Sequence, residues 1–174
     1  MIRQVGALWV VLLILFAAAN LMAQGKSSQA CSLLTATEIS AAVGTPGAPI
    51  GSDMPLRGGK GEIMKMCNWR LPAGGLHLSY TKAPQGGMRD AGMAQVRESL
   101  KTLKAQGWTT EEKAFGNTTC VVMTPPAGKK DAPNSTDCYA DAKGMGIGLG
   151  TISLKPTPMD KIKTLIDAAI GRLP

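Results

Sequence analysis

The four cysteines of this chain constrain its fold more than any other feature: Cys31, Cys67, Cys120 and Cys138. An even number of cysteines in an exported chain is typical of disulfides. No C-x-x-C pair occurs, which argues against a redox motif or a zinc knuckle. Four cysteines allow three pairings. We favour Cys31–Cys67 and Cys120–Cys138, because each pair joins neighbours in the sequence.

The N-terminus is typical of an export signal. Arg3 precedes an apolar run that ends at Asn20, and a small residue follows at Ala23. The run is shorter than the roughly 18 apolar residues that a membrane-spanning helix needs, so a cleaved signal is favoured over a membrane anchor. We expect a secreted or periplasmic protein with three parts: a signal peptide at 1–23, a flexible leader at 24–30, and one disulfide-stabilised domain at 31–174.

The charge of the chain is moderately basic. Its 19 Lys and Arg against 12 Asp and Glu give a net charge of +7, and aromatic residues make up 4%. The lysines are scattered and are not interleaved with aromatic residues, so no nucleic-acid surface is expected. The partners that remain are an unknown ligand or an envelope protein. Contact with a membrane is expected only through an uncleaved signal or weak electrostatic attraction.

The first element of the domain is a short helix that starts after Thr35. Thr35 and Glu38 have the spacing of a capping box, and Leu34 and Ile39 have that of a hydrophobic staple. Gly44 is a suitable C-terminal stop. A Gly/Pro-rich passage follows at 44–63, which we expect to be a long loop; a short edge strand near Ile50 is the alternative that its sequence allows.

Periodicity predicts the remaining elements. Alternating apolar residues predict a hairpin of strands at 64–71 and 76–82, and Met93, Val96, Leu100 and Leu103 form the apolar stripe of a helix at 88–106. The second half predicts four strands, with a long polar loop at 125–136, and a last helix with Thr157 as its N-cap. The predicted fold class is α+β: a mainly antiparallel sheet packed by three helices, in the order α-β-β-α-β-β-β-β-α.

Glycines alternate strictly with larger residues at 144–150. The segment has neither G-x-G-x-x-G nor a Walker motif, so it does not indicate a phosphate-binding loop. Alternation at a period of two places Met145, Ile147 and Leu149 on one face of a strand and bare backbone on the other. We expect a neighbouring group to pack closely against that bare face.

No catalytic set is indicated. His77 is the single histidine, and no G-x-S-x-G nucleophile elbow accompanies it. Ser79 and Lys82 match S-x-x-K, but residues three apart on a strand point to opposite faces. We therefore predict a protein that is not an enzyme and has no cofactor.

Methionines offer an alternative function. Met64 and Met66 form an M-x-M pair on a predicted strand, and His77 lies across the hairpin from them. Thioethers and imidazole are suitable ligands for Cu(I). The alternative prediction is a periplasmic Cu(I)-binding protein with a site at Met64, Met66 and His77, against the interpretation that the methionines are adaptable packing residues.

The beginning of the domain resembles a group of small exported bacterial proteins of unknown function. These begin C-x-L-L-T-x-x-E-I and continue through a glycine to a C-x-W strand. The matching residues here are Cys31, Leu33, Leu34, Thr35, Glu38, Ile39, Gly44, Cys67 and Trp69. Some of these proteins are lipoproteins with a PsbP-like α/β sandwich, so the resemblance implies that fold. This chain differs in lacking the Leu that usually precedes a lipidated cysteine.

The prediction from the sequence is an exported, non-enzymatic binding or accessory domain. Its site is expected in the 44–63 loop, in the 125–137 loop or on the exposed face of the sheet, because long loops and open sheet faces are where such domains bind.

Overall fold

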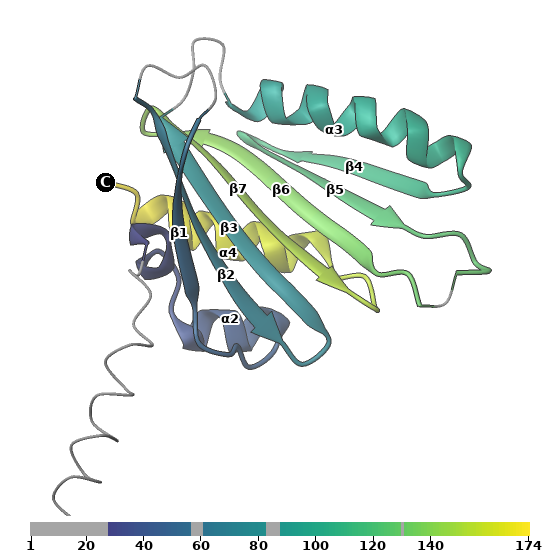
Figure 1. The fold of residues 1–174 in the computed structure, drawn as a ribbon, viewed down its shortest axis with the longest axis horizontal. Coiled ribbons are helices and arrows are strands. Elements are labelled where there is room, and N and C mark those ends of the chain that lie inside the picture. Colours follow the sequence, from purple (N-terminus) through teal and green to yellow (C-terminus); the bar gives the residue numbers. More distant parts are fainter. Residues whose placement is uncertain (1–27, 57–60, 83–87, 130) are drawn as a thin grey trace, which may run out of the picture.

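The computed structural model describes residues 28–56, 61–82, 88–129 and 131–174. In this part of the chain, seven antiparallel strands form one sheet with the order β1-β2-β3-β7-β6-β5-β4 (Figure 1). The elements are η1 (Gln29–Ser32), α2 (Ala36–Val43), β1 (Ile50–Pro55), β2 (Ile63–Leu71), β3 (Gly74–Lys82), α3 (Met88–Ala105), β4 (Thr109–Phe115), β5 (Thr118–Thr124), β6 (Asn134–Ala142), β7 (Met145–Ser153) and α4 (Met159–Gly171).

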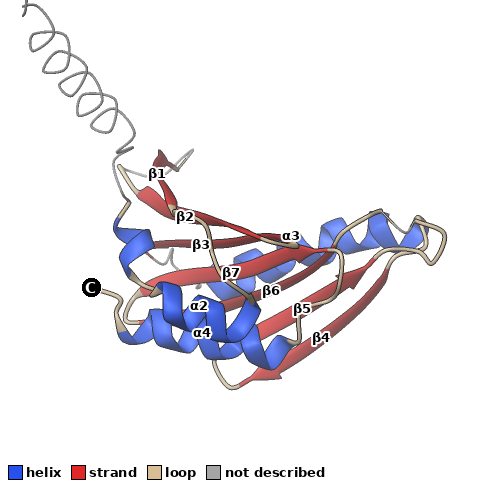
Figure 2. Ribbon diagram, turned by 90° about the horizontal axis from the view of Figure 1, so that it is seen from below, coloured by secondary structure: helices blue, strands red, loops and turns tan. Residues whose placement is uncertain are grey.

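The sheet separates two layers of helices (Figure 2). Its disulfide face, which carries Cys67, Leu149 and Cys138, is covered by η1, α2 and α4. Its histidine face, which carries His77, Gly150 and Asp137, is covered in part by α3, which packs on β4, β6 and β7. The fold class is therefore α+β with a predominantly antiparallel sheet, as the sequence predicts.

The main core lies on the disulfide face. Leu78 and Leu149 of the sheet are fully buried in one cluster with Ile162 and Ile166 of α4. These residues recur at a period of two on the strands and of three to four on the helix, so each element presents one apolar face. A smaller cluster lies on the histidine face, where the predicted stripe of α3 packs against Val121.

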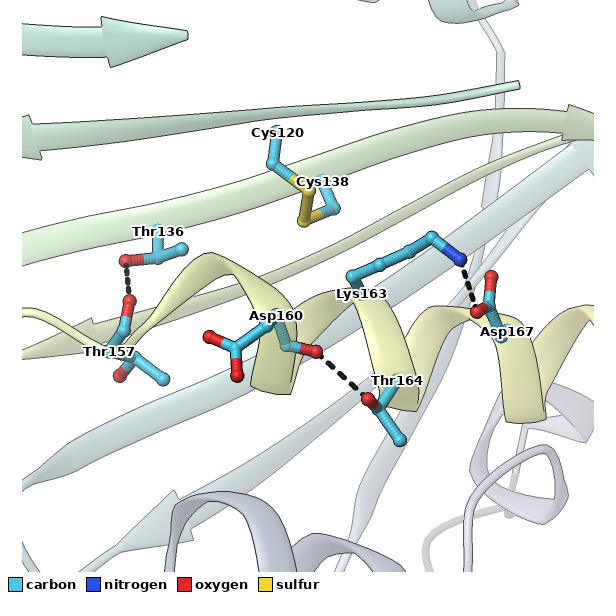
Figure 3. The surroundings of a disulfide bond; sticks show 8 residues. All are labelled: Cys120, Thr136, Cys138, Thr157, Asp160, Lys163, Thr164 and Asp167. Carbon is cyan, nitrogen blue, oxygen red and sulfur yellow. Dashed lines mark hydrogen bonds and ion pairs between the residues drawn. A yellow bond between two sulfur atoms is a disulfide. The ribbon is translucent and has the colours of Figure 1, made fainter. Parts of the chain in front are cut away.

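Both disulfides lie within this fold and have the pairing favoured from the sequence. Cys31 at the end of η1 bonds to Cys67 of β2, across a sequence separation of 36. Cys120 and Cys138 are directly opposite in the β5–β6 register and are bonded, with a separation of 18. Figure 3 shows this second disulfide facing α4. All four sulfurs are in the layer between the sheet and the helices of the disulfide face.

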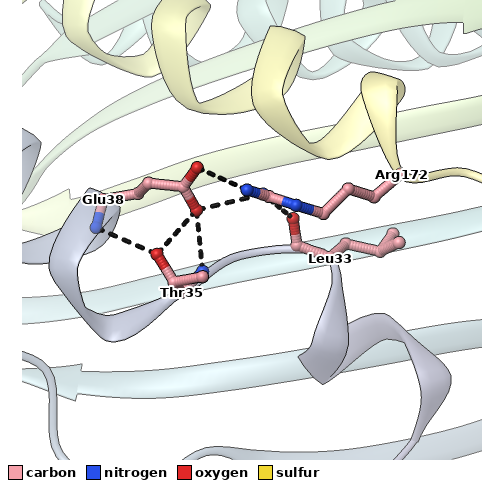
Figure 4. Close-up of polar contacts among 4 residues, drawn as sticks. All are labelled: Leu33, Thr35, Glu38 and Arg172. Atoms are coloured by element: carbon pink, nitrogen blue, oxygen red, sulfur yellow. Dashed lines mark hydrogen bonds and ion pairs between the residues drawn. The ribbon is translucent and has the colours of Figure 1, made fainter.

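The first and last helices are joined by one charged cluster (Figure 4). The Thr35 hydroxyl accepts from the Glu38 N–H, and the Glu38 carboxylate accepts from the Thr35 N–H, which completes the predicted capping box. The same carboxylate accepts two bonds from the Arg172 guanidinium at 2.7 and 3.0 Å. Arg172 also donates to the Leu33 carbonyl. The cap of α2 thereby serves as the attachment point for the end of α4.

The structure refines the two predicted loops. The 44–63 passage contains the edge strand that the sequence allowed near Ile50: β1 begins there and adds one strand to the predicted order. Because β1 is paired on one side only, it needs no apolar alternation. The predicted 125–136 loop ends early, because β6 begins at Asn134. Asn134 and Thr136 are polar residues of the kind common in loops, but both are buried. Their burial is possible because their side chains donate hydrogen bonds to the Leu154 and Thr157 carbonyls, as Figure 3 shows for Thr136.

The structure adds detail at both ends of the domain. Of the residues expected in the leader at 24–30, Ser28 and Ala30 are buried, and the Ser28 hydroxyl donates to the Asp53 carboxylate of β1. The last helix has Pro158, not Thr157, at its N-cap, and no side chain caps it. The predicted signal peptide at 1–23, the residues at 24–27 and the Gly86-Gly87 break lie outside the described residues. Among the helices that are described, none is long and apolar enough to cross a membrane.

Removing the Cys120–Cys138 disulfide is expected to destabilise the domain. A crosslink that closes a loop of this length stabilises a fold by about 3 kcal/mol in the chain-entropy model. We expect the Cys120→Ala/Cys138→Ala variant to lose about that much free energy of unfolding, measured by urea denaturation. The unreduced wild-type protein should show no alkylatable thiol by mass spectrometry. Free thiols in that sample, or an unchanged denaturation midpoint in the variant, would contradict the pairing.

Acid is expected to weaken the attachment between α2 and α4. Hydrogen bonds from Arg172, then from the Thr35 N–H, lower the pKa of Glu38 from 4.5 to about 2. A lowered pKa in the folded state means that the ionised carboxylate stabilises the fold above pH 4.5, and that this contribution disappears as the pH falls towards 2. Glu38→Gln should therefore be less stable than the wild type at pH 6, by a margin that shrinks between pH 4.5 and 2 in denaturant titrations.

The matched control is Glu98→Gln, because the Glu98 carboxylate pairs with Lys101 on the exposed surface of α3. Exposed pairs of this kind contribute little to stability. A pH profile that is the same for both variants would exclude the Glu38–Arg172 cluster as its source.

Candidate functional site

The glycines of β7 allow side chains from its two neighbouring strands to meet above it. Gly150 pairs with His77 of β3 on one side and with Asp137 of β6 on the other. The His77 Nε2 lies 3.3 Å from an Asp137 carboxylate oxygen. A Cβ at position 150 would lie 1.9 Å from that carboxylate and 2.6 Å from the imidazole. The bare face predicted from the alternating glycines is therefore covered by this cross-strand pair.

Gly148, two residues before Gly150 on β7, also leaves room for side chains from the two neighbouring strands. A Cβ there would be 3.4 Å from the Ser79 hydroxyl and from the ring of Tyr139. Burial, with the Asp137 charge as the smaller cause, raises the pKa of Tyr139 to about 12. Its phenol is therefore protonated at neutral pH.

The polar groups around Asp137 do not have the order of a catalytic triad. The Asp137 carboxylate accepts from the Ser135 hydroxyl at 2.9 Å and contacts His77 on its other side. A nucleophilic serine requires the imidazole between serine and carboxylate, whereas here the carboxylate is in the middle. Asp137 has 11% of its side-chain area exposed and His77 has 37%. The arrangement is thus a structural polar bridge with one accessible imidazole edge.

The predicted metal ligands are only partly brought together. Met64 and Met66 lie on the histidine face of β2, as predicted. His77 shares that face, but its imidazole leans over Gly150 toward Asp137. β7 lies on the other side of β3 from β2, so the ring leans away from the methionines. In the described part of the chain, no cluster of three or more His, Cys, Asp or Glu side chains is placed to bind a metal.

A cleft of about 550 Å³ opens on the disulfide face beside the start of α4. One wall is formed by the outer strands β4 and β5, and the other by the segment 156–160. The cleft exists because α4 packs on β5, β6 and β7 but not as far as the edge of the sheet. The lining residues that bear on binding are Glu111, Lys113, Phe115, Val122, Met159 and Asp160.

The lining of the cleft combines both signs of charge with apolar surface. The Lys113 ammonium lies over the Phe115 ring, 4.9 Å from its centroid, at a distance typical of a cation–π contact. Glu111 and Asp160 add carboxylates from opposite walls. Volumes of about 300–1,000 Å³ with a few polar groups are typical of small-molecule sites.

Sequence reasoning missed this cleft. The available signal was the alternation of Glu111, Lys113 and Phe115 at a period of two, which places all three on one face of β4. The second wall could not be found in this way, because Pro156 to Asp160 follow β4 by more than forty residues and meet it only through the packing of α4.

A second recess lies between α2 and α4. Its volume is about 350 Å³, and small or apolar side chains such as Ala41, Ala42 and Leu165 line it. It offers fewer polar groups to orient a ligand than the cleft beside β4. The cleft beside β4 lies on the disulfide face, which the helices partly cover, and is therefore not one of the three regions predicted from the sequence.

Comparison with known proteins finds a similar fold but no matching family. No protein-family model matches the chain, and no curated protein sequence matches it. Among solved structures, the extracellular domain of PknH from Mycobacterium tuberculosis is similar, with a TM-score of 0.54 and 14% sequence identity. The match covers 85% of this chain and 98% of that domain. At this identity, the likeness shows a shared α+β fold.

Replacing Gly150 by alanine is expected to destabilise the protein. The added Cβ would overlap the Asp137 carboxylate and the His77 ring, and overpacking of this kind costs about 1–3 kcal/mol. We expect Gly150→Ala to lose that much free energy of unfolding and to shift the His77 ring resonances in NMR spectra.

The control for this variant is Gly128→Ala, where an added Cβ meets no atom within 4 Å. Equal stability of the two variants would contradict the close contact of His77 and Asp137 above β7.

Proposed function

We propose that this chain is an exported, non-enzymatic binding domain that holds a small ligand in the cleft between β4, β5 and the start of α4. Two disulfides support export, because such bonds persist in oxidising compartments. The likeness in fold to an extracellular domain is consistent with that location. We also propose that the chain is related to the small exported bacterial proteins that the beginning of its domain resembles, some of which have a PsbP-like fold.

The polar groups of the histidine face favour binding over catalysis. His77 is engaged with Asp137, and the phenol of Tyr139 is held protonated. Ser79 and Lys82 of the S-x-x-K match lie on opposite faces of β3, since Ser79 faces Gly148 and Lys82 pairs with Met145. These groups therefore do not combine into a nucleophile and its base.

The observation that carries the proposal is the mixed charge of the cleft. The Lys113 ammonium can bind a carboxylate, and Glu111 or Asp160 can bind an amine. Phe115 and Val122 add apolar surface to the same lining. A small zwitterion with an apolar body, such as a short peptide with free termini, matches all three features.

The test is calorimetric titration with a tripeptide that has a central phenylalanine and free termini. We expect a dissociation constant on the order of millimolar or tighter. The same tripeptide with an acetylated N-terminus and an amidated C-terminus should bind more weakly, because it lacks both charges. Lys113→Gln should weaken binding of the free peptide about tenfold or more, since a hydrogen bond to a charged group contributes about 1.5–3 kcal/mol.

Lys129→Gln provides the matched control, because Lys129 is exposed in the β5–β6 loop, outside the cleft. It should bind the free peptide as the wild type does. Equal binding of free and blocked peptides, an unchanged affinity in Lys113→Gln, or no binding to the wild type would each overturn the assignment of this cleft.

A further inference from the structure

Three methionines lie together on the histidine face, at the edge of the sheet formed by β1 and β2. Met54 of β1 is directly opposite Met64 of β2 in the antiparallel register. Met66 is two residues further along β2 and therefore lies on the same face. Met54 was absent from the predicted metal site, because the edge strand expected near Ile50 had no predicted register against β2. The register of β1 is what places a third thioether beside the M-x-M pair.

These three side chains differ from the methionines of the core. Met93 and Met159 are buried, with 2% and 8% of their areas exposed, and they fill space under α3 and α4. Met54 has 49% of its area exposed, and Met64 and Met66 are half-buried. Packing therefore explains the core methionines but leaves the edge cluster available to bind.

The spacing of the cluster allows three sulfurs to reach one ion. Directly opposed residues of an antiparallel pair have Cα atoms about 4.5–5.5 Å apart. Residues two apart on a strand are separated by about 6.6 Å. An unbranched methionine side chain with three rotatable bonds can adjust over such distances, so the thioethers can converge above the sheet.

The chemistry of the cluster selects a soft monovalent ion. Thioethers favour Cu(I) and similar ions, whereas Mg²⁺ and Ca²⁺ require oxygen ligands. Among the residues paired between β1 and β2, the one carboxylate is that of Asp53, which lies on the opposite face of β1 and pairs with Lys65 at 3.6 Å. The imidazole of His77 leans toward Asp137 and does not complete the set.

We propose that Met54, Met64 and Met66 form a binding site for Cu(I) or a chemically similar soft ion. The site lies on the face of the sheet opposite the peptide cleft, so it does not depend on the proposed function. It replaces His77 of the predicted ligand set by Met54.

The test is titration of the full-length, disulfide-intact protein with Ag(I). Silver imitates Cu(I) as a soft ion but needs no reductant, so the disulfides stay intact. We expect one ion per chain in native mass spectra and shifts of three methionine methyl resonances in carbon-13 NMR spectra. Met54→Leu, Met64→Leu and Met66→Leu should each weaken binding at least tenfold, and a leucine of similar volume should preserve the fold.

Two controls separate this site from the alternatives. Met123→Leu, in the cluster beneath α3, and His77→Gln should both bind Ag(I) as the wild type does. Loss of binding in His77→Gln with normal binding in Met54→Leu would overturn the proposal in favour of the ligand set predicted from the sequence. A wild-type protein that binds no Ag(I), or a Met54→Leu variant with wild-type affinity, would exclude the three-methionine site. Thermal denaturation of each variant establishes that a lost affinity is not a lost fold.

Discussion

The structure depends on the pairing of β7 with β3 on one side and β6 on the other. β7 is the penultimate element in the sequence but the central strand of the sheet, so it joins the β1–β3 half to the β4–β6 half. One face of β7 carries Ile147 and Leu149 into the main core. Its other face carries glycines, which allow His77 and Asp137 to meet across the strand. Because each face has a separate role, a shift of register by one residue would disrupt both.

The periphery of the sheet is held by interactions between segments far apart in the sequence. Cys31–Cys67 attaches the first turn of the domain to β2, and Arg172 attaches the end of α4 to the cap of α2. The Glu38 carboxylate serves both the local cap and the long-range pair, which explains its low pKa. The two ends of the described chain therefore stabilise each other on the disulfide face.

The two proposed sites occupy the parts of the sheet that the helices leave uncovered. α4 does not extend over β4, which opens the cleft on the disulfide face. On the histidine face, β1 and β2 carry the methionine cluster, in which Met54 is exposed and the other two are half-buried. The first site has mixed charge and apolar surface and fits a small zwitterion. The second has thioethers and fits a soft ion. They lie on opposite faces at opposite edges of the sheet, so each can be tested without disturbing the other.

The sequence by itself determined the elements whose signals are local. The capping box at Thr35, the stripe of α3 and the alternation of β3 and β7 all depend on residues close together in the sequence. The even number of cysteines predicted disulfides and left three pairings, of which the structure contains the favoured one. Tertiary structure alone decided which distant segments meet. It formed β1 from a Gly/Pro-rich passage, extended β6 through polar residues that bond to Leu154 and Thr157, and turned His77 away from the methionines. It also brought Asp160 opposite Lys113. Such contacts depend on strand order and register, which the periodicity of one segment does not encode.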